Sequence, residues 1–169
     1  HVPGLFADDP EYRGKAERLA AKTHELVSFL TDLRGMDRVA ARFDGVVTYH
    51  DGCAGLRELG VRAQPRALLG TIAGLTLREM QDTDVCCGFG GTFCVKYPDI
   101  STRMVDDKVR NITATGADMV VAGDMGCLLN IAGRIRREGL PVQVRHVAEL
   151  LAGRVDAAPA IGETAGDGR

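Results

Sequence analysis

Between residues 9 and 34, apolar positions recur among charged ones in a constant helical phase. The apolar residues that keep this phase are Ala16, Leu19, Leu26, Val27, Leu30 and Leu33. This period places their side chains on one face of a helix. Asp9 and Pro10 supply a capping carboxylate and a proline suited to the first turn, and Gly35 is a typical C-terminal stop. We therefore expect one long amphipathic helix here.

Further along the chain, short apolar runs alternate with helix-like segments. Runs rich in β-branched residues predict strands at 46–50, 75–80, 119–122 and 142–144. The segments between and after them predict helices at 53–60, 65–73, 99–115, 127–138 and 146–151. Strands that alternate with helices imply crossover connections. We therefore expect an α/β fold, a three-layer Rossmann-like sandwich around a mainly parallel sheet.

The cysteines follow the predicted strands. Cys53 comes after the first strand, Cys86 and Cys87 come after the second, and Cys127 comes after the third. Ligands of parallel sheets bind beyond the carboxyl ends of the strands. We therefore expect these four thiols to lie on βα loops and to meet at one rim of the sheet.

Composition narrows the class of protein. The chain has 169 residues, 45% of them hydrophobic, enough for one domain with a real core. Its 21 Lys and Arg against 23 Asp and Glu leave no basic field, so we do not expect it to bind nucleic acid. No apolar run approaches the roughly 20 residues of a membrane helix. We expect a cytoplasmic protein. The sequence leaves open whether partner subunits bring it to the inner face of the membrane.

The cysteine count favours metal or redox chemistry. Five cysteines, Cys94 included, are an odd number and argue against a secreted disulfide framework. Consecutive cysteines project in different directions, so they suit the irons of an iron–sulfur cluster better than one tetrahedral zinc. Buried, inert thiols are the structural alternative. A relaxed disulfide between Cys86 and Cys87 is disfavoured by geometry.

The glycines after the cysteine pair have two interpretations. Gly88, Gly90 and Gly91 lack the Gly-Lys-Ser/Thr ending of a phosphate loop. Glycine instead allows backbone N–H groups to approach cluster sulfurs closely, which raises a reduction potential. We therefore expect these three glycines to line the cofactor.

Three motifs together resemble the cysteine-rich CCG domain family. They are Tyr49-His50-Asp51-Gly52-Cys53, the block Cys86-Cys87-Gly88-Phe89-Gly90-Gly91-Thr92-Phe93, and the run from Gly116-Ala117-Asp118 to Gly126-Cys127-Leu128. The family includes the cysteine-rich component of heterodisulfide reductase, the iron–sulfur component of glycolate oxidase and a component of lactate utilization. The glycine block and residues 146–151 look most like the last of these.

The resemblance implies a domain organisation and a cofactor. Residues 1–153 look like the C-terminal CCG domain of a longer protein, with a helical lead-in at 9–34, and we expect residues 154–169 to be a disordered tail. Family members bind an iron–sulfur cluster or zinc. The ligands implied here are Cys53, Cys86, Cys87 and Cys127, most simply around one [4Fe–4S] cluster, with zinc as the alternative or as a substitute in an aerobic preparation.

One position departs from the family pattern. Asp124 replaces the first cysteine of the final Cys-x-x-Cys, so a five-thiolate site is incomplete. Asp124 is either an oxygen ligand or, as we favour, the cap of the helix that carries Cys127. Cys94 lies outside the pattern, and His50 is open to a structural role or to ligation.

By resemblance, the chain is an iron–sulfur electron-transfer part of a multi-subunit oxidoreductase for L-lactate or a related 2-hydroxy acid such as glycolate. Its partners would be an N-terminal CCG domain of the same protein and the other subunits of that complex. We expect a component, not a self-sufficient enzyme, because no flavin or nicotinamide site is recognisable. The alternatives are a zinc-binding assembly module and a thiol–disulfide redox component like that of heterodisulfide reductase.

Overall fold

The computed structural model describes residues 2–163 of the chain. The chain divides into two compact units, His1–Met36 and Asp37–Arg169. The first unit is helical, and the second contains the sheet and all five cysteines.

The first unit contains short helices in place of the single long helix that the sequence pattern predicts. The helices are α1 (Val2–Leu5), α2 (Arg13–Ala20) and α3 (Leu26–Ser28), the last continuing as the wider turn η1 (Phe29–Leu33). The break lies at residues 21–25. There the Thr23 hydroxyl donates to the Leu19 carbonyl (2.8 Å), and the Glu25 carboxylate caps the next helix by accepting from the Ser28 N–H (2.8 Å). These local side-chain bonds compete with helical continuation, so the prediction of one helix was wrong.

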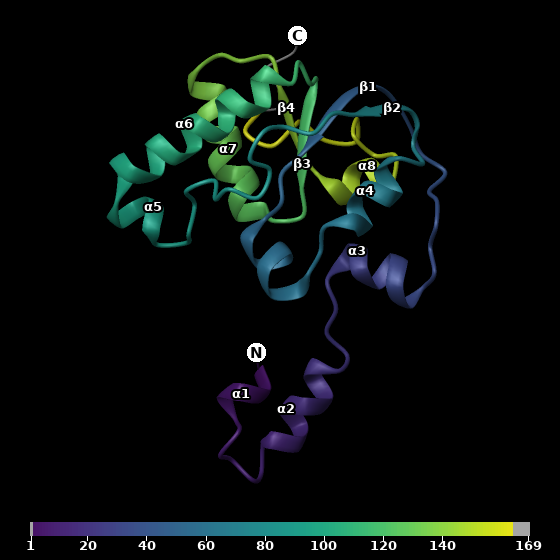
Figure 1. Ribbon diagram of the computed structural model, residues 1–169, viewed down its shortest axis with the longest axis vertical. Coiled ribbons are helices and arrows are strands. Elements are labelled where there is room, and N and C mark those ends of the chain that lie inside the picture. Colours follow the sequence, from purple (N-terminus) through teal and green to yellow (C-terminus); the bar gives the residue numbers. More distant parts are fainter. Residues whose placement is uncertain (1, 164–169) are drawn as a thin grey trace. The chain divides into compact units, whose positions relative to one another are not determined.

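The second unit is built on a four-stranded, all-parallel sheet with the order β2-β1-β3-β4 (Figure 1). Val47 pairs with Met119 and Tyr49 with Val121, so the ends of β1 and β3 lie side by side. The α/β, mainly parallel fold expected from the sequence is confirmed. The strands are β1 (Arg42–Tyr49), β2 (Ala73–Leu77), β3 (Met119–Ala122) and β4 (Gln143–His146).

Helices cover both faces of this sheet. On one face, α6 (Pro98–Ala114) packs against α7 (Met125–Arg137), and on the other α4 (Ala63–Leu69) packs against α8 (Val147–Leu151) (Figure 1). Two short helices lie in the connections: η2 (Ala54–Glu58) after β1, and α5 (Phe93–Lys96) within the glycine-rich segment. The result is three layers.

The core on the α6 and α7 side reaches the cysteines. Apolar side chains of both helices pack with the inner residues of β3 and β4, and Cys87 and Cys127 belong to the same buried cluster. Its other members include Val109, Ile112, Val120, Leu128, Ile131 and Val144. The sulfur atoms therefore lie at the edge of an apolar region, where ions interact more strongly than in water.

Part of the expected disordered tail is ordered. Ala160 is buried, the Ile161 N–H donates to the Val144 carbonyl (3.0 Å), and the Arg145 guanidinium donates to the carbonyl oxygens of Ala158 and Pro159. These contacts give residues 154–163 a defined path beside β4. Their Ala- and Gly-rich composition carried no sign of it. Residues 164–169 lie outside the described residues.

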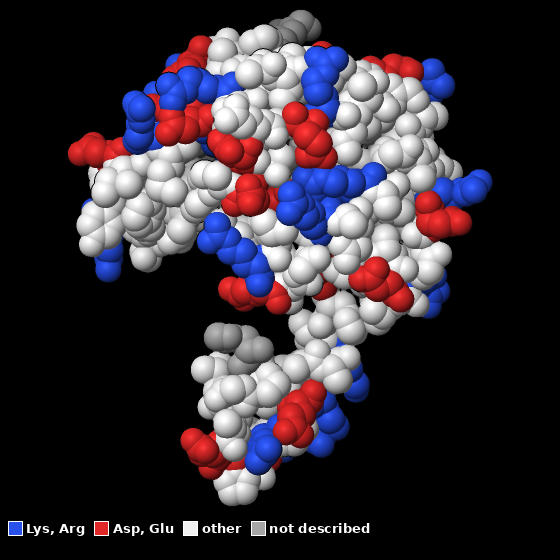
Figure 2. All heavy atoms as spheres, in the orientation of Figure 1, with Lys and Arg blue, Asp and Glu red and all other residues white. Residues whose placement is uncertain are grey.

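Charges of both signs are mixed over the face of the molecule that Figure 2 shows, in keeping with the near balance of 21 basic and 23 acidic residues. Among residues 2–163, no helix combines the length and apolar character needed to cross a membrane.

The packing of α7 gives a direct test of the fold. Ile131 is fully buried in the core, whereas Leu129 on the same helix is 55% exposed. We expect Ile131→Ala to lower the free energy of unfolding by about 2–5 kcal/mol, because it leaves a cavity in a packed interior. The control, Leu129→Ala, is expected to change it by no more than about 0.5 kcal/mol. Urea denaturation measures both, and equal effects would contradict this placement of α7.

Candidate metal centre

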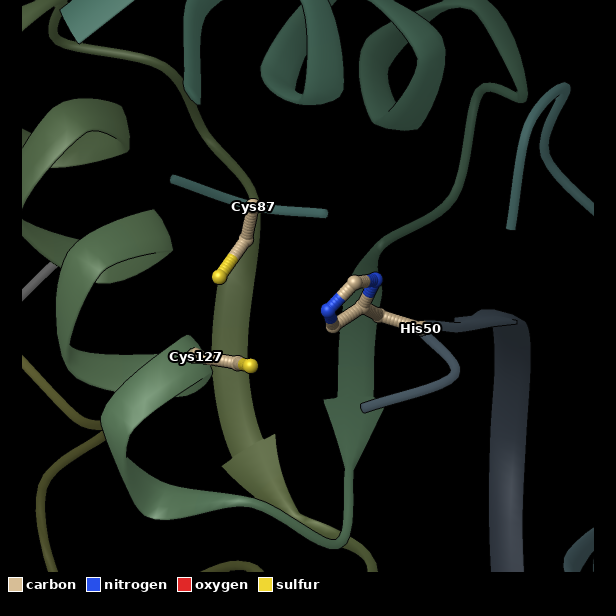
Figure 3. A group of neighbouring side chains, drawn as sticks. All are labelled: His50, Cys87 and Cys127. Carbon is tan, nitrogen blue, oxygen red and sulfur yellow. The ribbon is translucent and has the colours of Figure 1, made fainter. Parts of the chain in front are cut away.

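Three side chains from separate elements converge beyond the sheet. His50 follows β1, Cys87 lies in the loop that follows β2, and Cys127 lies in the first turn of α7. Their ligand atoms all lie within 4.8 Å of one another, and all three residues are buried. Figure 3 shows both sulfurs and the imidazole directed toward a common point. Two of the predicted ligands are therefore brought together, with a histidine beside them.

Backbone contacts fix these three residues in place. The His50 N–H donates to the Val121 carbonyl (2.9 Å), which extends the pairing of β1 and β3 by one residue. The Asn130 side-chain amide donates to the Cys87 carbonyl (2.9 Å), so α7 holds the loop that carries Cys87. The same helix carries Cys127, and a single rigid element thus sets the relative position of the two sulfurs.

Cys53 and Cys86 lie next to each other at the border of this group. Burial and the neighbouring Cys86 thiol raise the pKa of Cys53, and the charge of Cys87 contributes in the same direction. Both thiols are partly exposed. The Cys53 thiol therefore interacts with Cys86 and Cys87, while Cys87 and Cys127 are the two predicted ligands that belong to the compact group.

The buried thiols of Cys87 and Cys127 shift each other's pKa in opposite directions. Interaction with the Cys127 thiol lowers the pKa of Cys87 to about 5 against the opposing effect of burial, and His50 and the Phe89 N–H add to this lowering. The pKa of Cys127 is raised by Cys87, by burial and by Asp124. We place the thiolate on Cys87, since the Cys127 thiol and the Phe89 N–H stabilise its negative charge. A thiolate is the form that binds soft metals.

His50 has an unusual environment. Its side chain is fully buried, and within the part of the chain that the structure describes neither ring nitrogen makes a hydrogen bond. An unpaired buried nitrogen costs free energy unless a ligand satisfies it. Imidazole and thiolate are both ligands for zinc and iron. The donor set is therefore compatible with a metal centre.

Backbone N–H groups approach the sulfurs at one of the predicted glycines. The Gly88 N–H donates to Cys86 Sγ (3.4 Å). Gly88 has φ +85°, and a Cβ there would lie 2.7 Å from the Ser101 carbonyl oxygen of α6, so only glycine lets the loop pack this closely. Gly90 and Gly91 form the turn that leads into α5, where the Gly90 carbonyl accepts from the Phe93 N–H (3.1 Å).

The structure places Asp124 and Cys94 clearly. Asp124 caps α7: its carboxylate accepts from the Cys127 N–H (2.9 Å). The Cys94 thiol donates to the Gly91 carbonyl (3.2 Å) and lies outside the three-residue group. Both arrangements are structural contacts within the loops around the centre.

An ion pair between the buried Asp51 and the partly buried Arg66 supports the loop between His50 and Cys53. Both guanidinium NH groups of Arg66 donate to Asp51, at 2.8 and 2.9 Å, and the same side chain donates to Glu79 at 2.7 and 2.9 Å. Burial alone would lower the pKa of Arg66, but the two carboxylates raise it. Both carboxylate oxygens of Asp51 therefore bond to Arg66 of α4, and Asp51 is not available as a metal ligand.

Sequence reasoning missed Asn130 and Arg66 and left His50 open. Asn130 is a polar residue among the apolar positions of a predicted helix, and this exception in the pattern could have identified it. Arg66 carried none, since arginine on a helix is ordinarily exposed.

Known proteins resemble this chain over most of its length. Residues 47–132 match the cysteine-rich domain family called CCG. A protein named Lactate utilization protein A from an Exiguobacterium species is 47% identical over 149 residues, which cover 88% of this chain and 61% of that protein. Proteins of the same name from Bacillus cytotoxicus and Bacillus cereus are 46% and 45% identical over 152 residues, 90% of this chain and 64% of each relative.

The chain thus spans somewhat less than two thirds of the length of these relatives. The family match covers the end of β1, all of β2 and β3 and most of α7, and it includes Cys53, Cys86, Cys87 and Cys127. The chain belongs to the CCG family of cysteine-rich domains.

Proposed function

We propose that this chain is an iron–sulfur electron-transfer component of a system that oxidises L-lactate or a related 2-hydroxy acid such as glycolate. The observation that carries the proposal is the convergence of Cys87, Cys127 and the unpaired His50 at one buried point, with Cys53 and Cys86 beside them. Soft thiolates gathered from three loops are the ligands that iron–sulfur clusters require.

The proposed ligands are Cys53, Cys86, Cys87 and Cys127, which suit one [4Fe–4S] cluster. When bound, the cluster supplies reversible one-electron chemistry. The chain contributes the thiolates, the N–H bond from Gly88 to Cys86 and the apolar wall of α6 and α7. N–H bonds to sulfur and a dry surrounding are the levers by which a protein sets a cluster's potential.

The substrate class rests on the relatives. They are named for lactate utilization, and we extend that process to this chain. Removal of hydride from a 2-hydroxy acid needs a flavin or nicotinamide, so we assign that step to partner subunits and electron transfer to this chain. An N-terminal CCG domain of the same protein is a further proposed partner. We place the complex in the cytoplasm, with any contact to the inner membrane face made by partners.

A zinc-binding assembly module is the second candidate. The compact set of His50, Cys87 and Cys127 favours it, since one imidazole and two thiolates are common ligands of a tetrahedral zinc. The fourth ligand would come from Cys86 or Cys53. In this case the centre would hold the loops together and carry no electrons.

Anaerobic reconstitution separates the two functions. We expect the purified chain, treated with iron and sulfide without oxygen, to bind about four iron and four sulfide per protein and to give a paramagnetic signal on reduction with dithionite. Metal and sulfide counts with electron paramagnetic resonance measure this. Zinc bound without acid-labile sulfide, after the same procedure, would support the assembly module instead.

Substitution of each cysteine tests the ligand set. We expect Cys53→Ser, Cys86→Ser, Cys87→Ser and Cys127→Ser each to lower iron and sulfide content sharply, because a hydroxyl is a poor ligand for iron. Cys94→Ser is the matched control, since that thiol bonds the Gly91 carbonyl outside the centre, and it should keep the full content. Circular dichroism confirms folding. Equal iron loss in Cys94→Ser and Cys127→Ser would overturn the assignment.

Asp124 has a separate test. As the cap of α7, its removal in Asp124→Ala should cost about 0.5–2 kcal/mol of unfolding free energy, measured with urea, and leave iron content unchanged. Asp124→Asn should retain most of the stability, because asparagine is also a good cap. Loss of iron with unchanged stability of the apo-protein would instead identify a ligand.

A further inference from the structure

A buried lysine lies close to the centre and has no role in the function proposed above. Lys108, in the middle of α6, is 2% exposed and is among the largest fully buried side chains of the chain. Its ammonium group donates to the carbonyl oxygens of Asp82 and Thr83 (3.5 Å to the latter). Across residues 2–163, no carboxylate lies within ion-pair distance of it.

An ammonium group without a counter-ion is costly in such a place, because carbonyl dipoles only partly replace its hydration. Burial lowers the pKa of Lys108, and the acidic groups around it act in the opposite direction. Cys87 has the largest such effect, followed by Asp82, Asp84 and Asp51. The strongest source of compensating negative charge is therefore a thiol of the centre.

The two carbonyl groups that Lys108 binds belong to the segment that leads into the cysteine pair. Asp82 has φ +55°, a left-handed conformation that is uncommon for residues other than glycine. The Thr83 carbonyl also accepts from the Asp51 N–H (3.1 Å), next to His50. Lys108 thus connects α6 to the backbone that presents Cys86 and Cys87 and to the end of β1.

We propose that Lys108 is a positioning residue of the centre, whose buried positive charge balances the thiolates and stabilises the more negative, reduced state of the bound cluster. This inference rests on the proposed function. Each electron that enters the cluster adds one negative charge, and a fixed cation nearby in a poorly polarisable region lowers the free energy of that state. Removal of the charge should therefore lower the reduction potential.

Three variants separate charge from packing. Lys108→Met keeps the length of the side chain without its charge, Lys108→Gln keeps a donor for the carbonyl groups without the charge, and Lys108→Arg keeps the charge. The matched control is Arg110→Met, which removes a positive charge from the same helix at a position whose side chain is 63% exposed. Iron and sulfide counts and circular dichroism establish loading and folding for each protein.

The midpoint potential of the reconstituted protein is the decisive measurement, obtained by anaerobic titration with dithionite and followed by electron paramagnetic resonance. We expect Lys108→Met and Lys108→Gln to weaken reduction at least tenfold, which is about 59 mV for a one-electron couple. Lys108→Arg should lie near the parent protein, and Arg110→Met should equal it. If Lys108→Met does not fold or load, Lys108→Gln decides.

A parent-like midpoint in a fully loaded Lys108→Gln or Lys108→Met protein would overturn the proposal. If the parent chain binds only zinc, the electron-transfer function fails, and the role of Lys108 is then read from zinc retention against a chelator. In that case both uncharged variants should lose zinc at least tenfold faster than Arg110→Met. Equal loss would refute the charge-balancing role as well.

Discussion

The close approach of two buried sulfurs and one imidazole constrains the structure around them. Cys87, Cys127 and His50 place their ligand atoms within 4.8 Å of one another, with both histidine nitrogens unpaired among the described residues. These thiols and this imidazole need a hydrogen-bond partner or a metal, yet they lie at the border of the apolar core, where little water is present to satisfy them. Such an arrangement is stable only if the surrounding backbone prevents the three elements from separating.

The parallel sheet and its adjoining helices meet this requirement. His50 continues the pairing of β1 with β3, so its position is fixed by the sheet itself. Asn130 and the cap formed by Asp124 tie the Cys87 loop and the Cys127 turn to α7. The Asp51–Arg66 ion pair connects the segment between His50 and Cys53 to α4 on the opposite face. Both helical layers thus hold the same rim.

The sequence was informative where the period of apolar residues or the spacing of cysteines indicated an element and its position. The apolar run at 119–122 indicated a strand buried on both faces, and the cysteines after successive strands indicated one rim. It was uninformative where individual side-chain contacts determine the path of the chain. The helix break at 21–25 depends on side-chain bonds of Thr23 and Glu25, and the order of residues 154–163 depends on Arg145. The convergence of His50 with the sulfurs depends on strand register, which spacing alone does not define.

Two cations near the rim, the partly buried Arg66 and the fully buried Lys108, act differently on the charge of the centre because their partners differ. The guanidinium of Arg66 contacts two carboxylates, so its charge is neutralised locally and its field at the sulfurs is weak. Lys108 contacts backbone carbonyl oxygens, so its charge is only partly balanced, by the Cys87 thiolate and by carboxylates that make no ion pair with it. A buried cation of the second kind destabilises the empty fold and stabilises an anionic centre. The positive charge of Lys108 in α6 therefore favours the protein with its metal centre bound over the empty protein.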